Sequence, residues 1–266
     1  MDTSSLIVNA LWITETQFLP FLLIFIRVSG VLFTAPLFGD RMIPVQVRIG
    51  LGLLIAMVLA PTLKAEQWPA AMPEPLILFF VASAELVVGL IVGFCTRLLF
   101  EGVQLAGQLI GYQMGFSMAN VLDPVSGAQV SILGQLEVFL ALFIFLSINA
   151  HHLLLRAMVE SFRLIPPLGF QPRGILVERV MVLAGRIFIL AIQIGAPVIA
   201  AILFSNVFLG IMARTMPQMN VFMVAMPIGI ALGLVVLALS TPLLAQVLSQ
   251  AFGSLDRSLM FLMKGM

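Results

Sequence analysis

The feature that most constrains this chain is a stretch of 41 residues, 215–255, that contains no charged side chain. A helix needs about 20 apolar residues to cross the hydrocarbon core of a bilayer, so this stretch is twice as long as one straight span. It must therefore bend, tilt or leave the hydrocarbon. Pro217, Pro227 and Pro242 are the available bending points, because proline interrupts the hydrogen bonds of a helix.

The composition extends this constraint to the whole chain. Hydrophobic residues make up 61% of the 266 residues and charged residues 9%, whereas soluble domains have roughly 45–50% apolar and about 25% charged residues. One aqueous core cannot bury so much apolar surface. The apolar runs are continuous, which favours helices over the alternating strands of a barrel. The sequence therefore predicts an all-α membrane protein.

Six apolar runs give the positions of the expected helices. They lie at 18–38, 45–61, 76–100, 130–150, 187–213 and 219–248, and an amphipathic tail follows at 249–266. The clearest linker is 164–174, which contains three prolines and two glycines. We find no internal repeat of fixed period, and the net charge of +1 provides no basic field for nucleic acid.

Several charged residues stand inside the apolar runs or near their ends. They are Arg27, Glu85, Arg97, Glu101 and Glu137. A charge at the centre of a bilayer costs about 2.5–3.5 kcal/mol on insertion scales, so these groups should face protein or water. Two interpretations stay open: the charges pair within the chain or reach the interface from helix ends, or their helices pack against partner subunits.

A second unusual segment is 102–129, GVQLAGQLIGYQMGFSMANVLDPVSGAQ. Gly107, Gly111 and Gly115 recur at every fourth position, which gives a helix a smooth stripe for close approach of another backbone. The bulky side chains around this stripe are Tyr112, Met114, Phe116 and Met118. We expect the helix to end at Asp123-Pro124, because the residue before a proline disfavours helical geometry.

Two interpretations of this segment stay open. The glycine stripe is typical of tight helix packing. Alternatively, the glycines loosen a segment that lines or obstructs a pore, a role that suits the unbranched and adaptable side chain of methionine.

A third unusual segment is 213–230, ARTMPQMNVFMVAMPIGI, which we name the elbow segment. It is too broken for an ordinary membrane span and too apolar for an ordinary loop. Pro217 cannot continue a helical ladder, and the side chains of Gln218 and Asn220 can bond to exposed backbone groups. The segment predicts a turn within an apolar region.

The sequence offers no catalytic motif, and it predicts a protein that is not an enzyme and has no cofactor or metal site. His151 and His152 form the only histidine site, and no second cluster of ligands accompanies them. No HExxH, Walker A or GxGxxG motif is present. Without a means of hydrolysing ATP, any transport by this chain would need another source of energy.

The elbow segment resembles the signature of the flagellar biosynthetic protein R family, whose relatives are the T components of virulence type III secretion systems. The similarity lies in RTMPQMNVF at 214–222 and in the proline that follows it; its positions are Arg214, Pro217, Gln218, Asn220, Phe222 and Pro227. Further similarity lies in GYQMGFSMANVLDP at 111–124 and RVSGVLFTAPLFGDRMIP at 27–44. The resemblance covers essentially the whole chain.

The resemblance implies one subunit of the flagellar type III export gate. Such a subunit assembles with the P and Q subunits, is contacted by the B subunit, and passes unfolded flagellar proteins across the inner membrane. The fold implied is a set of long, bent helical hairpins in a hetero-oligomeric assembly of the basal body, raised toward the periplasm, and not a standard lipid-bathed bundle.

The resemblance also implies a division of the chain. Residues 1–174 would be similar to the P subunit, and residues 175–266 would form a hairpin similar to the Q subunit, with its bend at the elbow segment. In this family the channel is closed by a loop of this subunit together with methionines of P. The matching positions here run from Gly107 to Asp123, and we name 107–123 the plug segment.

Two other functions stay open as alternatives. A secondary transporter would use broken helices at a substrate site, and it predicts paired broken segments in two halves of the chain. An intramembrane enzyme would require a catalytic set.

Overall fold

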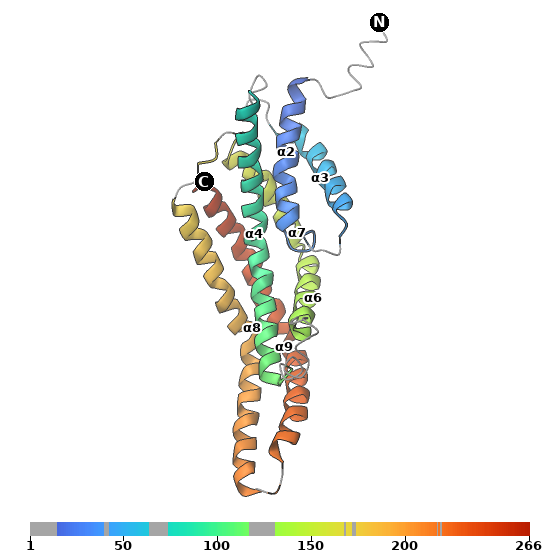
Figure 1. Cartoon of the computed structure of the whole chain (residues 1–266), viewed down its shortest axis with the longest axis vertical. Coiled ribbons are helices and arrows are strands. Elements are labelled where there is room, and N and C mark those ends of the chain that lie inside the picture. The colour runs from blue at the N-terminus through green and yellow to red at the C-terminus, as the bar shows by residue number, and fades with distance from the viewer. Residues whose placement is uncertain are drawn as a thin grey trace. The chain divides into compact units, whose positions relative to one another are not determined.

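The structure is a computed structural model that describes residues 15–39, 43–63, 74–116, 131–167, 169–171, 174–216, 218 and 220–266, without the side chains of 15–17 and 221–222. This part of the chain contains seven α-helices (Figure 1). They are α2 (Glu15–Thr34), α3 (Val45–Leu59), α4 (Pro75–Met114), α6 (Ile132–Ser147), α7 (Ala150–Leu164), α8 (Gly174–Thr215) and α9 (Val221–Met263). A short 3-10 helix, η1 (Ala60–Thr62), continues α3. No strand occurs in the described ranges, so the all-α prediction is confirmed.

Four helical segments are long and apolar enough to cross a membrane. They are Val45–Thr62, Pro75–Met114, Gly174–Thr215 and Met223–Met263. Helices α6 and α7 would together make a fifth, and α2 supplies a shorter apolar helix. The chain is therefore an all-α membrane protein, as its composition predicted.

Three helices are much longer than one membrane span. Helices α4, α8 and α9 contain 40, 42 and 43 residues, which corresponds to about 60 Å each at 1.5 Å per residue. Helix α8 ends at Thr215 and α9 begins at Val221, so the chain breaks within the elbow segment, as predicted. Pro227 and Pro242 lie inside α9 and do not end it.

The apolar run 130–150 contains a break that its hydropathy did not predict. Asn149 adopts a positive φ of 57°, a left-handed geometry that asparagine tolerates better than most residues. Its amide donates to the carbonyl of Leu146 at 3.1 Å. Helix α6 therefore ends at Ser147, and α7 begins at Ala150.

The chain packs into two compact units, and each gathers segments from both sides of the linker 164–174. Unit 1 comprises Met1–Arg97, His152–Val180 and Asp256–Met266, and unit 2 comprises Leu98–His151 and Met181–Leu255. These two units are defined by which segments pack together. The predicted division of the chain into 1–174 and 175–266 rests instead on resemblance to two different subunits, and it stays a prediction.

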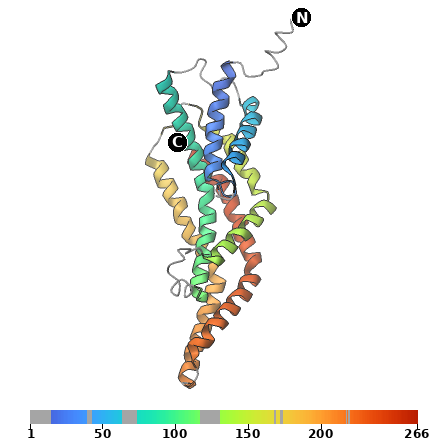
Figure 2. The same cartoon turned by 45° about the vertical axis from the view of Figure 1, so that its right-hand side comes forward.

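In unit 1, α2 packs closely against α4 and α3 lies beside α2 (Figure 2). A Cβ atom on Gly30 would lie only 2.8 Å from the carbonyl oxygen of Leu86, so the two backbones approach more closely than larger side chains allow. Leu19, Leu23 and Val81 form a buried cluster between these helices. The last turns of α9 also belong to this unit, where the amide of Gln171 donates to the carbonyl of Met266 at 2.9 Å.

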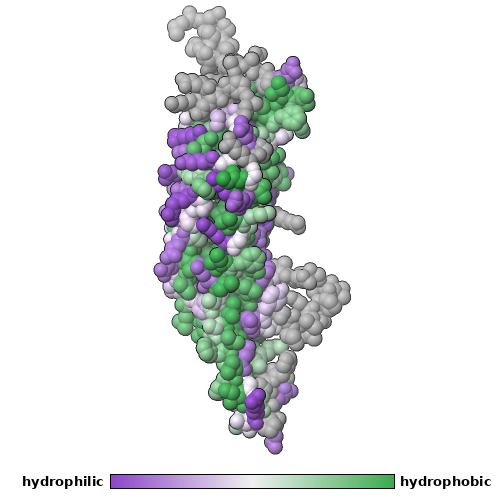
Figure 3. All heavy atoms as spheres, turned by 90° about the vertical axis from the view of Figure 1, so that its left-hand side faces the viewer, coloured by the Kyte–Doolittle hydropathy of each residue, from purple (hydrophilic) through white to green (hydrophobic). Residues whose placement is uncertain are grey.

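In unit 2, α8 and α9 form a hairpin whose two helices are joined at residues 216–220 (Figure 1). The face of this hairpin seen in Figure 3 is mainly apolar, with hydrophilic residues near its tip. The rings of Phe100, Phe145 and Phe252 connect α4, α6 and α9, with centroids 5.1–5.7 Å apart. Unit 2 thus brings the end of α4 together with α6 and the hairpin.

Candidate functional site

Helix α4 ends at Met114, so the predicted helix end at Asp123-Pro124 is wrong. Gly115 has a positive φ of 89°, which reverses the backbone directly after the helix. The amide of Phe116 donates to the carbonyl of Gly111 at 3.0 Å, and that of Gly115 donates to Tyr112 at 3.2 Å. This pair of bonds is a Schellman motif, which satisfies the last carbonyls of a helix and favours glycine at the left-handed position. Gly115 therefore ends the helix several residues before Pro124, the proline that was expected to end it.

The glycine stripe brings α4 into backbone contact with α6. A Cβ atom on Gly107 would lie 2.6 Å from the Cα of Gly134 and 2.7 Å from the carbonyl oxygen of Leu133. A Cβ atom on Gly111 would lie 3.2 Å from the Oγ of Ser131. That hydroxyl also accepts from the amide of Gly134 at 3.1 Å and so caps the start of α6. Tight helix packing, one of the two interpretations of the stripe, therefore holds for Gly107 and Gly111.

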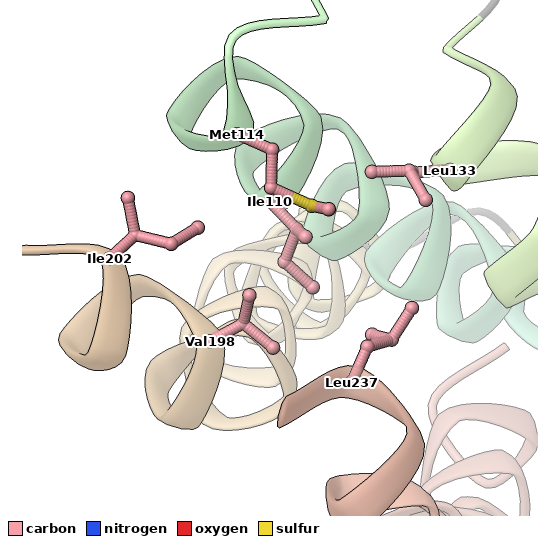
Figure 4. Close-up of a cluster of buried hydrophobic side chains, with 6 residues drawn as sticks. All are labelled: Ile110, Met114, Leu133, Val198, Ile202 and Leu237. Carbon is pink, nitrogen blue, oxygen red and sulfur yellow. The ribbon is translucent and has the colours of Figure 1, made fainter. Parts of the chain in front are cut away.

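Four helices of unit 2 contribute to one buried cluster at the end of α4 (Figure 4). Its members are Ile110 and Met114 from α4, Leu133 from α6, Val198 and Ile202 from α8, and Leu237 from α9. Figure 4 shows these side chains directed toward one another. Met114 is only 1% exposed, so its side chain is part of the core.

The other residues of the plug segment differ in their exposure. Tyr112 is 62% exposed, whereas Phe116 is half-buried and packs against the cluster. Met118 and Asp123 lie outside the described residues. The described part of the plug segment, 107–116, is therefore the last turns of α4 and their cap, packed against α6, α8 and α9.

The elbow segment separates α8 from α9. Arg214 is exposed in the last turn of α8, and Gln218 and Asn220 are exposed in the break between the helices. The carbonyl of Asn220 accepts from the amide of Met223 at 3.0 Å, which starts α9. Pro227 is exposed within α9. Pro217 and the side chain of Phe222 lie outside the described residues.

Arg27 and Glu85 form a fully buried ion pair in unit 1. The Nε of Arg27 lies 2.5 Å from the Oε2 of Glu85, and the two side chains are 0% and 3% exposed. The guanidinium also donates to the Oγ of Ser161 at 3.3 Å and to the carbonyl of Ile165 at 2.9 Å. It lies over the ring of Phe162, 4.1 Å from the centroid. Internal pairing, the first interpretation of the charges, therefore holds for these two residues.

Glu137 is a different case. It is 1% exposed on α6, and its Oε2 has no hydrogen-bond partner in the described part of the chain. Arg97 is exposed and Glu101 is half-buried, both on α4. The five charges therefore do not form one site.

Several residues at these contacts were not recognised from the sequence. Ser161 and Phe162 complete the surroundings of Arg27. Gly229 and Gly233 of α9 face Met114. The spacing of four between these two glycines in an apolar helix was a usable signal of close helix approach. The described residues contain no group of three His, Cys, Asp or Glu side chains that could hold a metal ion.

Residues 18–255 match the family described as bacterial export proteins, family 1. The chain belongs to this family. A similar protein is the flagellar biosynthetic protein FliR of Bacillus subtilis (strain 168), which is 37% identical over 238 residues, covering 87% of this chain and 90% of the relative. FliR of Escherichia coli (strain K12) is 30% identical over 250 residues, covering 92% and 94%. FliR of Aquifex aeolicus (strain VF5) is 29% identical over 241 residues, covering 90% and 92%.

Membership of the bacterial export family confirms the resemblance drawn from the sequence. The motifs at 27–44, 111–124 and 214–222 all lie within the matched residues. The first begins in α2, the helix that carries Arg27, and runs past its end at Thr34. The second includes the end of α4, and the third contains the break between α8 and α9.

Proposed function

We propose that this chain is a structural and channel-forming subunit of the flagellar type III protein export gate. It passes unfolded flagellar proteins across the bacterial inner membrane during assembly of the flagellum, in a basal-body complex with the P, Q and B subunits. Its support is membership of the bacterial export family and similarity to proteins named flagellar biosynthetic protein FliR. The all-α membrane fold is consistent with this role.

The observation that carries the gating part of the proposal is the arrangement on either side of residues 117–130. The chain leaves the packed end of α4 at Phe116 and re-enters the described structure at Ser131. The end of α4 and the start of α6 lie side by side, because Gly111 faces the hydroxyl of Ser131 and Gly107 faces Gly134. The plug segment 107–123 therefore starts in a part of α4 that packs closely against the first turn of α6.

A channel that admits a polypeptide must be closed at rest, because ions would otherwise leak across the membrane. Bulky, adaptable side chains such as Met118 close such a channel without a rigid wall, and a glycine such as Gly115 permits the backbone to change direction. The buried position of Met114 limits the obstructing part of the plug segment to residues after Gly115.

The division of the chain belongs to the same proposal. Residues 1–174 correspond to a P-like part and residues 175–266 to a Q-like hairpin. Two observations support it: α8 begins at Gly174, and α8 and α9 run as a hairpin with its break at 216–220.

The test replaces residues 117–123 in the complete gate complex. A deletion of 110–118 would remove Ile110 and Met114 from the core, so it would damage the fold as well as the gate. Instead, residues 117–123 are replaced by seven glycine and serine residues, which keeps the chain length and removes the bulk. The complex is expected to assemble, to leak ions or small solutes, and to keep secreting flagellar substrates.

The matched control replaces exposed Tyr112 with phenylalanine, which keeps the bulk on α4 and should leave the membrane tight. If the replaced complex assembles fully and stays as tight as the wild type, residues 117–123 do not close the channel. No contact among the described residues favours the alternative function, a secondary transporter.

A further inference from the structure

Glu137 stands on the face of α6 that packs against α4 and α9. Residues four apart share one face of a helix, and Leu133, Glu137 and Ala141 are all buried. Leu133 belongs to the same buried cluster as Ile110 of α4 and Leu237 of α9. The carboxyl group of Glu137, whose residue is only 1% exposed, therefore lies in the core of unit 2.

The same face of α6 continues to Phe145, two turns after Glu137. The centroid of its ring lies 5.6 Å from that of Phe100 of α4 and 5.1 Å from that of Phe252 of α9. The buried residues before and after Glu137 thus contact the same two helices through apolar groups. Glu137 is the one charged residue in this row.

Unit 2 contains few groups that could neutralise a carboxylate at this position. Its only basic residues are His151, Arg186 and Arg214. Both arginines are exposed, and His151 stands 14 residues further along the chain, which corresponds to about 21 Å of helix. The Oε2 of Glu137 has no hydrogen-bond partner in the described residues. An ion pair like that of Arg27 and Glu85 is therefore not available to it within unit 2.

The other titratable groups of the surrounding helices give no support to a carboxylate either. Helix α4 contributes the half-buried Glu101 and the exposed Tyr112 to unit 2, and a second carboxyl group disfavours the charge of the first. Helix α8 has no charged residue between its two arginines, and α9 has none from 221 to 255. Glu137 therefore faces an apolar and nearly uncharged part of the protein.

An ionised carboxylate in an apolar core is costly unless it is paired, and in proteins such a group takes up a proton. We infer that Glu137 is a proton-binding site of unit 2: it is held as a neutral carboxylic acid, and the packing of α6 against α4 and α9 depends on that proton. This inference goes beyond the proposed function and does not rest on it. A rise in pH removes the proton, leaves a carboxylate in the core and so weakens the packing.

The first experiment compares the wild type with Glu137→Gln in the complete gate complex. Glutamine has the shape of a neutral glutamic acid, donates a hydrogen bond and cannot ionise. In acidic solution, amide hydrogen exchange in α6 should be the same in both complexes. In alkaline solution it should be several-fold faster in the wild type, because only the wild type then buries a charge. Comparing the two complexes at the same pH removes the effect of pH on the exchange chemistry itself.

The matched control is Glu160→Gln, which removes a glutamate that already has a partner. The Oε1 of Glu160 lies 2.9 Å from the Nη1 of Arg163 on α7. Exchange in α6 of this variant should follow the wild type at every pH. A second measurement is the unfolding temperature of the complexes: the advantage of Glu137→Gln over the wild type should grow by a few degrees as the pH rises, and Glu160→Gln should show no such trend.

Every outcome of these measurements decides the inference. Equal exchange of α6 in the wild type and in Glu137→Gln at all pH values overturns it, and so does an unfolding-temperature difference that does not change with pH. Faster exchange of Glu137→Gln in acidic solution, or its failure to assemble, also overturns it, because a neutral residue of the same shape should replace a neutral acid. None of these results bears on whether residues 117–123 close the channel, so the proposed function is tested separately.

Discussion

Arg27 shows how one buried charge is stabilised in a chain that is mostly apolar. Its guanidinium binds Glu85 of α4, Ser161 of α7 and the carbonyl of Ile165, which directly follows α7. A buried charge without such partners would cost several kcal/mol. The ion pair therefore connects three segments of unit 1 and fixes the end of α7.

Breaking this pair should strongly destabilise unit 1. Glu85→Leu leaves the guanidinium of Arg27 buried without its carboxylate, which typically costs about 3–5 kcal/mol. The measurement is the thermal unfolding temperature of the purified complex in detergent. The double variant Arg27→Leu with Glu85→Leu should recover much of the loss, because apolar residues of similar volume often replace a buried pair without large cost.

The chain offers an exposed pair as a control for this prediction. The Nη1 of Arg163 lies 2.9 Å from the Oε1 of Glu160, and the side chain of Arg163 is 63% exposed. Exposed pairs contribute about 0–1 kcal/mol, so Arg163→Ala should scarcely change the unfolding temperature. Equal effects of Glu85→Leu and Arg163→Ala would contradict the structural role assigned to Arg27.

Single residues also mark where sequence reasoning succeeds and where it fails. The spacing of Gly107 and Gly111 correctly predicted a close helix contact, because a helix repeats its face every three to four residues. The predicted end of the same helix was wrong. Gly115 is compatible with both a helix interior and a left-handed cap, and only packing decides between them. The partner of Arg27 lies 58 residues away, and no local pattern identifies it.

At the scale of helices, the apolar runs located every candidate span but underestimated the lengths of α4, α8 and α9. Helix α4 continues past the run 76–100 to Met114, through Arg97 and Glu101. Arginine, glutamate, leucine and glutamine all have good helix propensity, so a charge ends an apolar run without ending the helix. Hydropathy therefore predicts the apolar part of a helix, while the caps determine where the helix ends.

The elbow segment makes a prediction at this scale. Replacing Pro217, Gln218 and Asn220 with leucine removes the proline and the polar side chains from the break between α8 and α9. The chain should then favour one straight apolar helix in place of the hairpin. We expect loss of complex assembly, measured by co-purification, and loss of motility, measured by swimming.

A control separates the proline from the polar residues. The double variant Gln218→Leu with Asn220→Leu keeps Pro217, so it should retain the break and assemble better than the triple variant. Wild-type complex yield and swimming in the triple variant would refute the role of these residues in forming the turn.

At the scale of the whole molecule, the amount of exposed apolar surface is the main fact to explain. Within α8, four large apolar residues between 203 and 208 are 57–75% exposed: Leu203, Phe204, Val207 and Phe208. Within α9, the charge-free residues 221–255 rise about 50 Å, whereas the hydrocarbon core is about 30 Å thick. Lipid tails therefore cannot cover the whole apolar length, even when the helix tilts.

The remaining apolar surface should be covered by other subunits, so the chain should depend on partners for its stability. We predict that the chain expressed alone is heterogeneous and sensitive to protease, and that co-expression of the P and Q subunits yields a monodisperse, resistant complex. This expectation does not rest on Arg27 and Glu85, which pair with each other within the chain. It rests on the length of the charge-free part of α9 and on the exposed face of α8.

The measurement is size-exclusion chromatography and limited proteolysis of the chain purified alone, with P only, and with P and Q. If partner subunits cover the hairpin, protease should cleave within 203–240 in the chain alone, and that cleavage should disappear in the full complex. Cleavage confined to residues outside α8 and α9 would mean that the lone hairpin is already protected. A monodisperse, protease-resistant chain obtained without P and Q would show that lipid or detergent suffices to cover this surface, and it would contradict the dependence on partners.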